Sequence, residues 1–309
     1  MLGFRDRLVI LMYHRVLARP DPYHAGDVDA EAFDWQLAVL KRYFNVLPLT
    51  EAAERLKRSA LPPRAVCITF DDGYADNVEI ALPLLQRHQL HATFFIAAGY
   101  LDGGRMWNDT VIEALARTSG ETLDLTKSGL GTYGVANDVA RVGAIKELLG
   151  RLKYLQPEDR LHKSTVIAEA VGKSLPDHLM MTTAQLRRLS KAGMEIGAHT
   201  MSHPILSSLS DEASRTEIEG SITRLRELLG QEIPTFAYPN GRPGKDYGRR
   251  DVENVGRAGI RVAVSTAWGY ANSSMDSHQL ARIAPWDATP ARFALRVFRS
   301  YFGAPPAVL

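Results

Sequence analysis

The chain has 309 residues, of which 45% are hydrophobic and 23% are charged, and its formal net charge is +2. Such a chain can build a sizeable core, either as one barrel or as two smaller domains, and its near-neutral charge gives no electrostatic case for a nucleic-acid partner. The single cysteine, Cys67, rules out an internal disulfide, and the apolar residues around it indicate a small buried side chain.

The N-terminal segment does not have the pattern of a secretory leader. Residues 8–13 form an apolar run that His14 and Arg15 interrupt too soon for a signal peptide, and no small-residue cleavage site follows. No stretch of the sequence approaches the length of a transmembrane helix. The sequence therefore favours a cytoplasmic location, with a removed leader, or peripheral membrane association through the amphipathic segment 290–301, left open.

Strand-like and helical patterns alternate along the chain. Short apolar, partly β-branched runs predict strands at residues 8–13, 44–49, 65–70, 92–97, 194–198, 235–238 and 261–264. The spacing of apolar residues predicts helices at 31–43, 50–57, 76–89, 183–191, 211–230 and 290–301, with Thr50 as the cap of the second helix. Seven strands alternating with helices predict an α/β fold with a parallel, barrel-like sheet, in a single domain over residues 1–309.

Residues 118–181 break this alternation. A polar, Gly-rich stretch at 128–137 precedes two helical patterns at 138–155 and 157–171. We interpret the whole segment as a helical insertion within the domain. It could serve as a lid over a site, or it could be a surface elaboration with no catalytic part, and the sequence leaves both roles open.

Two motifs together predict a metal-dependent hydrolase. They are Thr69-Phe70-Asp71-Asp72-Gly73-Tyr74 and His199-Thr200-Met201-Ser202-His203, and each follows a predicted strand. Catalytic groups of parallel α/β folds collect at the carboxyl ends of strands. Two imidazoles and a carboxylate can hold a divalent metal with positions left open for water and substrate, and a second carboxylate can accept a proton. Taken singly, a histidine pair arises by chance and Asp-Asp-Gly is a common turn sequence.

An ordered series of motifs resembles the polysaccharide deacetylases of carbohydrate esterase family four. After Thr69–Tyr74 come Asp76-Asn77, Ala81-Leu82-Pro83-Leu84-Leu85, Ala92-Thr93-Phe94-Phe95-Ile96, the Glu195–Pro204 segment, Phe236-Ala237-Tyr238-Pro239-Asn240-Gly241 and Leu280-Ala281-Arg282-Ile283. The resemblance covers roughly residues 8–287 apart from the inserted helices. It implies a distorted (β/α) barrel with about seven parallel strands.

The resemblance also implies roles for the two motifs. Asp72, His199 and His203 would bind one divalent metal, and Asp71 would be the catalytic base. Zn²⁺ suits one carboxylate and two imidazoles, with Co²⁺, Ni²⁺ or Fe²⁺ also feasible. The backbone N–H of Tyr238 would stabilise the developing oxyanion.

Two positions depart from the commoner family pattern. The histidine that many relatives carry near the C-terminus is absent, whereas His14 ends the first predicted strand, as in the similar, circularly shifted poly-N-acetylglucosamine deacetylases. We therefore predict that His14 is the general acid, with a structural role as the alternative and His278 as the next candidate. Many relatives carry an arginine where this chain has Ala237; Arg282 is a plausible substitute for orienting Asp71, or else part of a surface ion pair.

Aromatic side chains could stack on sugar rings. Trp107, Trp268 and Trp286 are candidates, although each could equally be a core residue. Trp107 begins a segment similar to one near the groove of relatives. We predict that Tyr74, Trp107, Asn240 and Trp268 contact the substrate.

The predicted function is hydrolytic removal of N-acetyl groups from amino sugars of a glycan or glycoconjugate, with release of acetate. The predicted partner is thus an N-acetylated saccharide, while partner proteins stay unknown. Two alternatives remain open: hydrolysis of a cyclic imide or ureide at the same site, and a catalytically silent glycan-binding domain. The sequence does not specify the glycan or its length.

Overall fold

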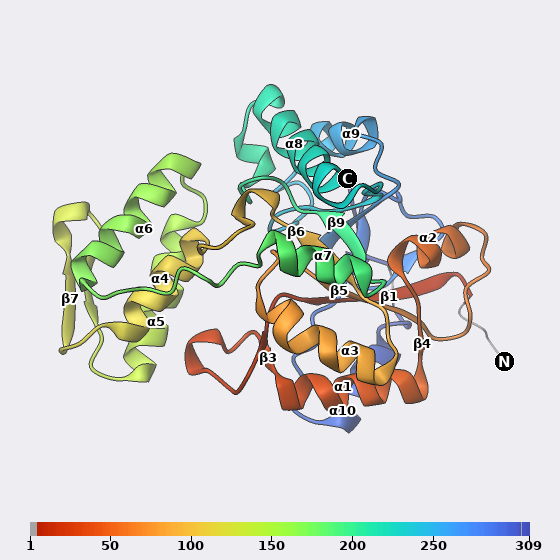
Figure 1. Ribbon diagram of the computed structural model, residues 1–309, viewed down its shortest axis with the longest axis horizontal. Helices are drawn as coiled ribbons and strands as arrows, with labels where there is room; N and C mark the ends of the chain where they lie inside the picture. Colours follow the sequence, from red (N-terminus) through yellow and green to blue (C-terminus); the bar gives the residue numbers. More distant parts are fainter. Residues whose placement is uncertain (1–4, 304) are drawn as a thin grey trace. The chain divides into compact units, whose positions relative to one another are not determined.

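The computed structural model describes residues 5–303 and 305–309, and the chain forms two compact units. The first unit comprises residues up to 19, 26–101 and 181–309, and the second comprises residues 20–25 and 102–180. The second unit thus begins earlier than the predicted insertion and includes a short segment that lies far upstream in the sequence. Figure 1 shows the elements of both units, coloured along the chain.

The first unit is built on a ring of parallel strands. In the order in which they pair, the strands are β1 (Arg7–Tyr13), β5 (Ala65–Phe70), β6 (Thr93–Ile96), β9 (Glu195–Ala198), β10 (Thr235–Ala237), β11 (Val262–Trp268) and β13 (Leu280–Arg282). The Met12 N–H donates to Ile283 O and the Ile283 N–H donates to Ile10 O, both at 2.9 Å, so β13 returns to β1. The predicted distorted α/β barrel is confirmed.

Short strands and helices surround this ring. The additional strands are β4 (Asn45–Val46) beside β5, β12 (Ala271–Asn272) antiparallel to β1, and the pair β2 (Val16–Leu17) and β3 (Val28–Asp29). The helices are α1 (Ala30–Tyr43), α2 (Leu49–Lys57), α3 (Leu82–His88), α7 (Thr183–Lys191), α8 (Asp211–Leu229), α9 (Arg249–Arg257) and α10 (Pro290–Arg299). Single turns occur at η2 (Asn77–Ala81), η3 (Ala98–Tyr100) and η5 (Leu206–Ser208). In the described part of the chain no helix is long and apolar enough to cross a membrane.

The start of α2 corrects one prediction. The predicted strand at 44–49 ends at Val46, and the helix begins at Leu49 after Pro48, so Thr50 is not its cap. Proline fixes its own φ near the helical value. It also has no backbone N–H that would be left without an acceptor, which makes it suitable at a helix start. The Thr50 N–H instead donates to Oε2 of Glu195 at 3.2 Å, because α2 lies against the amino end of β9.

Alternation along β1 places two different hydrophobic clusters on the two faces of the sheet. Leu8 and Ile10 belong to a cluster inside the ring, and Val9 and Leu11 belong to the larger cluster under the outer helices. Residues of α2 join the inner cluster, and α2 contacts β1, β5 and β11. Because α2 covers the amino ends of the strands, their carboxyl ends are left uncovered by this helix and can carry a functional site.

The second unit has a core of its own. It contains α4 (Trp107–Arg117), α5 (Asp138–Leu152), α6 (Pro157–Val171), a hairpin of β7 (Thr122–Leu125) and β8 (Gly131–Gly134), and the turns η1 (Pro22–His24) and η4 (Thr126–Ser128). The two predicted helices are present, and part of the Gly-rich stretch forms β8. Its hydrophobic cluster includes Leu115, Leu148 and Ile167, all fully buried.

Candidate active site

Three side chains that could hold a metal meet at the carboxyl ends of β5 and β9. Asp72 Oδ1 lies 3.4 Å from His199 Nε2 and 3.3 Å from His203 Nε2. The ligand atoms of these residues all lie within 4.8 Å of one another. His199 Nδ1 donates to the Ala237 carbonyl oxygen at 2.7 Å, which leaves Nε2 as the atom that faces Asp72.

The donor set fits a divalent cation. The Oδ1 atom of Asp72 is buried and makes no hydrogen bond of normal geometry within the described chain. Leaving such an atom without a partner is costly, and a cation would satisfy it. Two imidazole nitrogens and one carboxylate oxygen are ligands that Zn²⁺ prefers, and three protein ligands leave its remaining positions open.

Unusual backbone conformations orient the side chains of these candidate ligands. Asp72 has φ 77° and His203 has φ 53°, both at positive φ, which is uncommon outside glycine although Asp and His adopt it more often than most residues. The Met201 and Ser202 N–H groups donate to Glu217 Oε2 at 2.9 and 2.8 Å, so α8 holds the loop between the two histidines. Strained conformations of this kind persist only where the surrounding contacts impose them, and they cluster at functional sites.

Asp71 makes a buried, two-point ion pair with Arg282. Nη1 and Nη2 of Arg282 each lie 2.7 Å from one carboxylate oxygen of Asp71. The remaining Arg282 donors reach the Ser265 carbonyl at 3.0 Å and the Thr69 hydroxyl at 3.2 Å. Because the Arg282 side chain is fully buried, this is not a surface ion pair. The guanidinium fixes the orientation of the Asp71 carboxylate.

Nearby positive charges keep both carboxylates ionised. Burial raises the pKa of Asp71, but the charges of Arg282, His199 and His14 together hold that pKa below its usual value. Burial also raises the pKa of Asp72, and His203, His199 and His14 again lower it by more. Asp71 can therefore accept a proton at neutral pH.

His14 follows β1 and is half-buried. Its side chain lines a small hollow of about 100 Å³, together with residues that include Asp27 and Trp286. The Asn77 amide donates to the His14 carbonyl oxygen at 2.9 Å, which ties the end of β1 to the segment after Asp72. His14 is thus held near both carboxylates, while its role as general acid stays a prediction.

Asp76 also fixes this segment. Its carboxylate accepts from Arg15 Nε at 2.8 Å and from the Val16 N–H at 3.2 Å. Asp76 lies within a sequence motif but had no predicted function, and Glu217 was not predicted at all. No local signal marks Glu217, because it acts on backbone N–H groups of a distant loop.

Tyr238 and Asn240 lie just beyond β10. The Tyr238 N–H donates to Val264 O at 3.3 Å, so an oxyanion there would have to compete with a long hydrogen bond. The Tyr238 ring is buried, and its hydroxyl donates to His278 O at 2.9 Å. Asn240 has φ 59°. His278, the second candidate for the acid, precedes β13 at its amino end, away from the carboxyl-end edge that carries Asp71.

The aromatic candidates differ in exposure. Tyr74 is buried beneath the Arg15 guanidinium, which lies 4.7 Å from the ring centroid. Trp107 belongs to the second unit, where the Arg160 guanidinium lies 5.0 Å from its ring centroid. Trp268, the last residue of β11, is 48% exposed and stacks on the exposed Trp286. Sugar contacts by any of them stay predictions.

This fold and site define a class: an α/β barrel with a two-histidine, one-aspartate constellation beside an arginine-paired aspartate at the carboxyl ends of its strands. The model of the polysaccharide deacetylase family matches residues 58–122 and 159–263, more than half of the chain. The chain therefore belongs to the polysaccharide deacetylase family.

Known proteins agree with this assignment. A Bacillus subtilis protein described as the polysaccharide deacetylase YxkH is 20% identical over 279 residues, which cover 90% of this chain and 71% of that protein. Among solved structures, the Streptococcus pyogenes deacetylase PplD in complex with acetate has a TM-score of 0.63 at 20% identity, covering 96% of this chain and 99% of that one. IcaB from Ammonifex degensii has a TM-score of 0.60 at 19% identity, covering 96% and 98%.

Proposed function

We propose that this protein is a metal-dependent hydrolase that removes N-acetyl groups from amino sugars of a glycan or glycoconjugate and releases acetate. The observation that carries the proposal is the buried Asp72 oxygen between two imidazole nitrogens, with the Asp71–Arg282 pair beside it. Family membership supports the reaction class, and relatives with the same fold are described as deacetylases.

Asp72, His199 and His203 would hold the metal. Zinc bound there would lower the pKa of a coordinated water molecule and polarise the acetamide carbonyl. The chain's own residues then handle protons: a carboxylate oxygen of Asp71 accepts one from the attacking water, and Arg282 keeps that carboxylate ionised and correctly turned.

Two further groups complete the proposed reaction. An imidazole N–H of His14 donates a proton to the departing amine, without which an amide nitrogen is a poor leaving group. The Tyr238 N–H donates to the carbonyl oxygen as negative charge develops on it, exchanging its long bond to Val264 O for a stronger one.

Acetate release from N-acetylglucosamine oligomers tests the proposal, together with the zinc content of the purified protein. We expect the wild-type chain to release acetate, His199→Ala to lose both activity and zinc, and Asp71→Asn to keep zinc while losing about 10²–10⁴-fold in rate. Full activity of zinc-loaded Asp71→Asn would move the base elsewhere. Ring opening of a cyclic imide or ureide supplied as a second substrate, without acetate release from the oligomers, would favour the imide alternative.

A further inference from the structure

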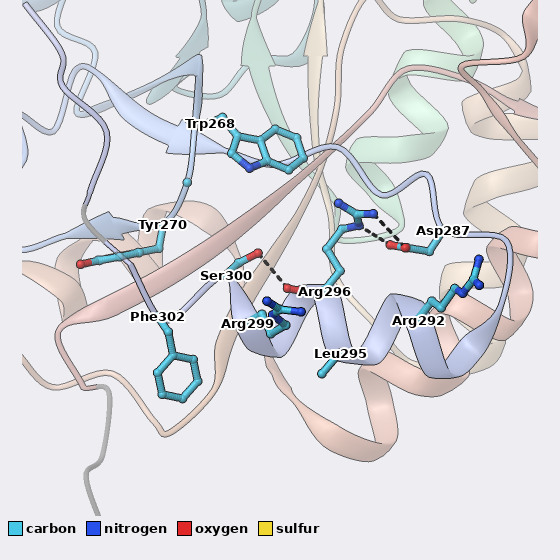
Figure 2. A pocket seen from close by; sticks show the side chains of 10 residues that line it. Trp268, Tyr270, Asp287, Arg292, Leu295, Arg296, Arg299, Ser300 and Phe302 are labelled. Atoms are coloured by element: carbon cyan, nitrogen blue, oxygen red, sulfur yellow. Dashed lines mark hydrogen bonds and ion pairs between the residues drawn. The ribbon is translucent and has the colours of Figure 1, made fainter.

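A second hollow in the first unit lies beside the candidate active site. Its volume is about 440 Å³, and it is formed by the end of β11, the following turn and α10 (Figure 2). The lining residues are Trp268, Gly269, Tyr270, Asp287, Arg292, Leu295, Arg296, Arg299, Ser300 and Phe302. A space of this size accommodates a ligand of several chemical groups rather than a single ion.

The charge of the lining is strongly positive. Arg292, Arg296 and Arg299 line the hollow against a single carboxylate, that of Asp287. Their spacing along α10 places all three on one side of the helix, as Figure 2 shows. Asp287 is engaged by Arg296, with Nη2 3.0 Å from Oδ1. Within the described chain, no carboxylate pairs with the guanidinium of Arg292 or Arg299.

One exposed indole, that of Trp268, lines the hollow, and a second, that of Trp286, stacks on it. The Trp268 and Trp286 rings stack with centroids 4.8 Å apart and an interplanar angle of 24°, and both are about half exposed. The Arg296 guanidinium lies 4.8 Å from the Trp286 centroid, so its pair with Asp287 also holds the indole in place. Stacking covers one face of each indole, and the other face of the Trp268 ring suits the apolar face of a pyranose.

The indole pair connects this hollow to the reacting groups. Trp268 is the register partner of Arg282, the residue that holds Asp71. Trp286 also lines the small hollow that contains His14. A saccharide with its acetamido group at Asp71 could therefore continue across the indoles toward the three arginines.

We infer that this arginine-lined hollow binds a phosphoryl group of the substrate, which makes the substrate a phosphate-bearing N-acetylated glycoconjugate. The two unpaired guanidiniums offer more N–H donors than one carboxylate can accept, whereas a phosphate has three terminal oxygens and up to two charges. The inference rests on the proposed function, because it names the substrate class of that same site.

Equilibrium binding of two matched probes tests the inference without relying on catalysis. The probes are an N-acetylglucosamine tetramer with a phosphate at its reducing end and the same tetramer without phosphate, and the reported quantity is Kd from calorimetry and tryptophan fluorescence. We expect the phosphorylated tetramer to bind about tenfold more tightly, with the advantage shrinking as salt is added. Equal Kd values for the two tetramers would overturn the inference.

Variants locate the effect. Arg292→Ala combined with Arg299→Ala should abolish the phosphate preference, and the corresponding double lysine variant should retain part of it. The matched control removes two exposed positive charges from the end of α2, by Lys57→Ala with Arg58→Ala, and should keep the preference. A control variant that loses as much as the α10 variant would show a general charge effect and overturn the inference.

Two further measurements separate the competing explanations. Flotation with anionic phospholipid vesicles tests a membrane surface; vesicle binding that depends on Arg292 and Arg299, without any preference between the tetramers, would replace the phosphoryl site by a membrane contact. Acetate release from both tetramers tests the proposed function separately. Phosphate-dependent binding without acetate release from either tetramer would contradict the proposed function but leave the phosphoryl site standing.

Discussion

Arg282 and Asp71 place two opposite charges in a position that is almost fully buried. Removing one partner of such a pair leaves the other charge buried and uncompensated. We predict that Arg282→Ala lowers the free energy of unfolding by about 3–5 kcal/mol. Urea unfolding followed by circular dichroism measures this loss.

The matched control for this prediction is the pair between Arg261 and Glu54, in which both side chains are more than half exposed. Arg261→Ala should cost only about 0–1 kcal/mol, because solvent screens an exposed pair. Similar losses in the two variants would mean that burial of the Asp71 pair does not matter as argued.

The role of His14 can be separated from simple structural support by the choice of substrate. We predict that His14→Ala slows hydrolysis of an acetamide about 10²–10⁴-fold but slows hydrolysis of an activated acetate ester much less, because that leaving group needs no proton. His162→Ala, at an exposed position of α6, is the control. Equal losses on amide and ester would assign the proton to another group.

Residues that carry the candidate chemistry could be found from the sequence because they lie in short motifs at strand ends. Asp71 and Asp72 follow β5 directly, and His199 follows β9 directly. Glu217 could not be found in this way. It holds the His199–His203 loop through two backbone N–H groups and the Ser202 hydroxyl, and the backbone donors leave no mark on the residue types that carry them.

At the scale of elements, a close backbone crossing supports the His199–His203 loop. The Gly99 N–H donates to Met201 O at 2.8 Å, and a Cβ atom on Gly99 would lie 2.5 Å from that oxygen. We predict that Gly99→Ala lowers the free energy of unfolding by about 1–3 kcal/mol and weakens zinc binding, because the loop must move. Thermal unfolding and zinc titration measure the two effects.

Gly143 supplies the opposite case for comparison. It lies within α5, and a Cβ atom there would meet no atom within 4 Å. Gly143→Ala should therefore stabilise the protein by about 0.5–1 kcal/mol through helix propensity alone. If Gly99→Ala behaved like Gly143→Ala, the crossing would not be tight in solution.

The carboxyl group of Glu195, at the amino end of β9, predicts a pH dependence of stability. Burial raises the pKa of Glu195, and the Thr50 N–H and nearby threonine hydroxyls oppose that rise without cancelling it. The folded chain thus keeps this proton to a higher pH than the unfolded chain does. The free energy of unfolding should fall as pH rises from the ordinary glutamate pKa, about 4.3, through the raised pKa.

Glu195→Gln removes the titrating group and should remove this part of the slope, so the variant gains stability relative to wild type as pH rises. Urea midpoints at several pH values between 4 and 8 measure the difference. Glu227→Gln, which changes an exposed carboxyl of α8, should leave the slope as in wild type. A Glu195→Gln profile parallel to wild type would contradict the prediction.

Elements with strong local signals were predictable, and elements that depend on packing were not. The α8 helix begins after Ser210, whose side chain accepts from the Ala213 N–H, and ends at Gly230 in the left-handed conformation, so both ends are marked in the sequence. The α9 helix was missed. Its apolar pattern is sparse, and it buries the polar side chains of Asp251 and Asn254.

At the scale of the whole molecule, the two units have separate hydrophobic clusters. All five residues of the Asp71, Asp72, His199, His203 and Arg282 constellation belong to the first unit. Gly104 pairs with His178, so the segment 102–180 enters and leaves the second unit at adjacent points. We predict that replacing residues 105–177 by a short Gly-Ser linker leaves the first unit folded and able to bind zinc.

Circular dichroism, urea unfolding and zinc titration of this shortened chain test the prediction. His199→Ala in the same background serves as the control and should lose zinc while remaining folded. A shortened chain that unfolds or aggregates would show that the barrel depends on the second unit for its stability.

The bounds of the second unit could not be predicted from the sequence, because they depend on long-range contacts. Its helices α5 and α6 have local patterns, and both were predicted. The segment 20–25 joins them through long-range contacts, such as the hydrogen bond from the Tyr23 hydroxyl to Asp138 Oδ1 at 2.6 Å. Contacts of that kind depend on the folded geometry and leave no periodic signal in the chain.

Because β13 pairs with β1, the barrel can close only after the C-terminal part of the chain has been synthesised. Asp71 and Arg282 are separated by 211 positions, and a ribosome that adds ~5–20 residues per second needs about 10–40 s to synthesise that stretch. During this interval the nascent barrel has an open seam, and its aspartate has no counter-ion. Completion of the last strand therefore closes the sheet and pairs Arg282 with Asp71 in the same event, so a chain that stops short of β13 has neither the closed barrel nor the pair.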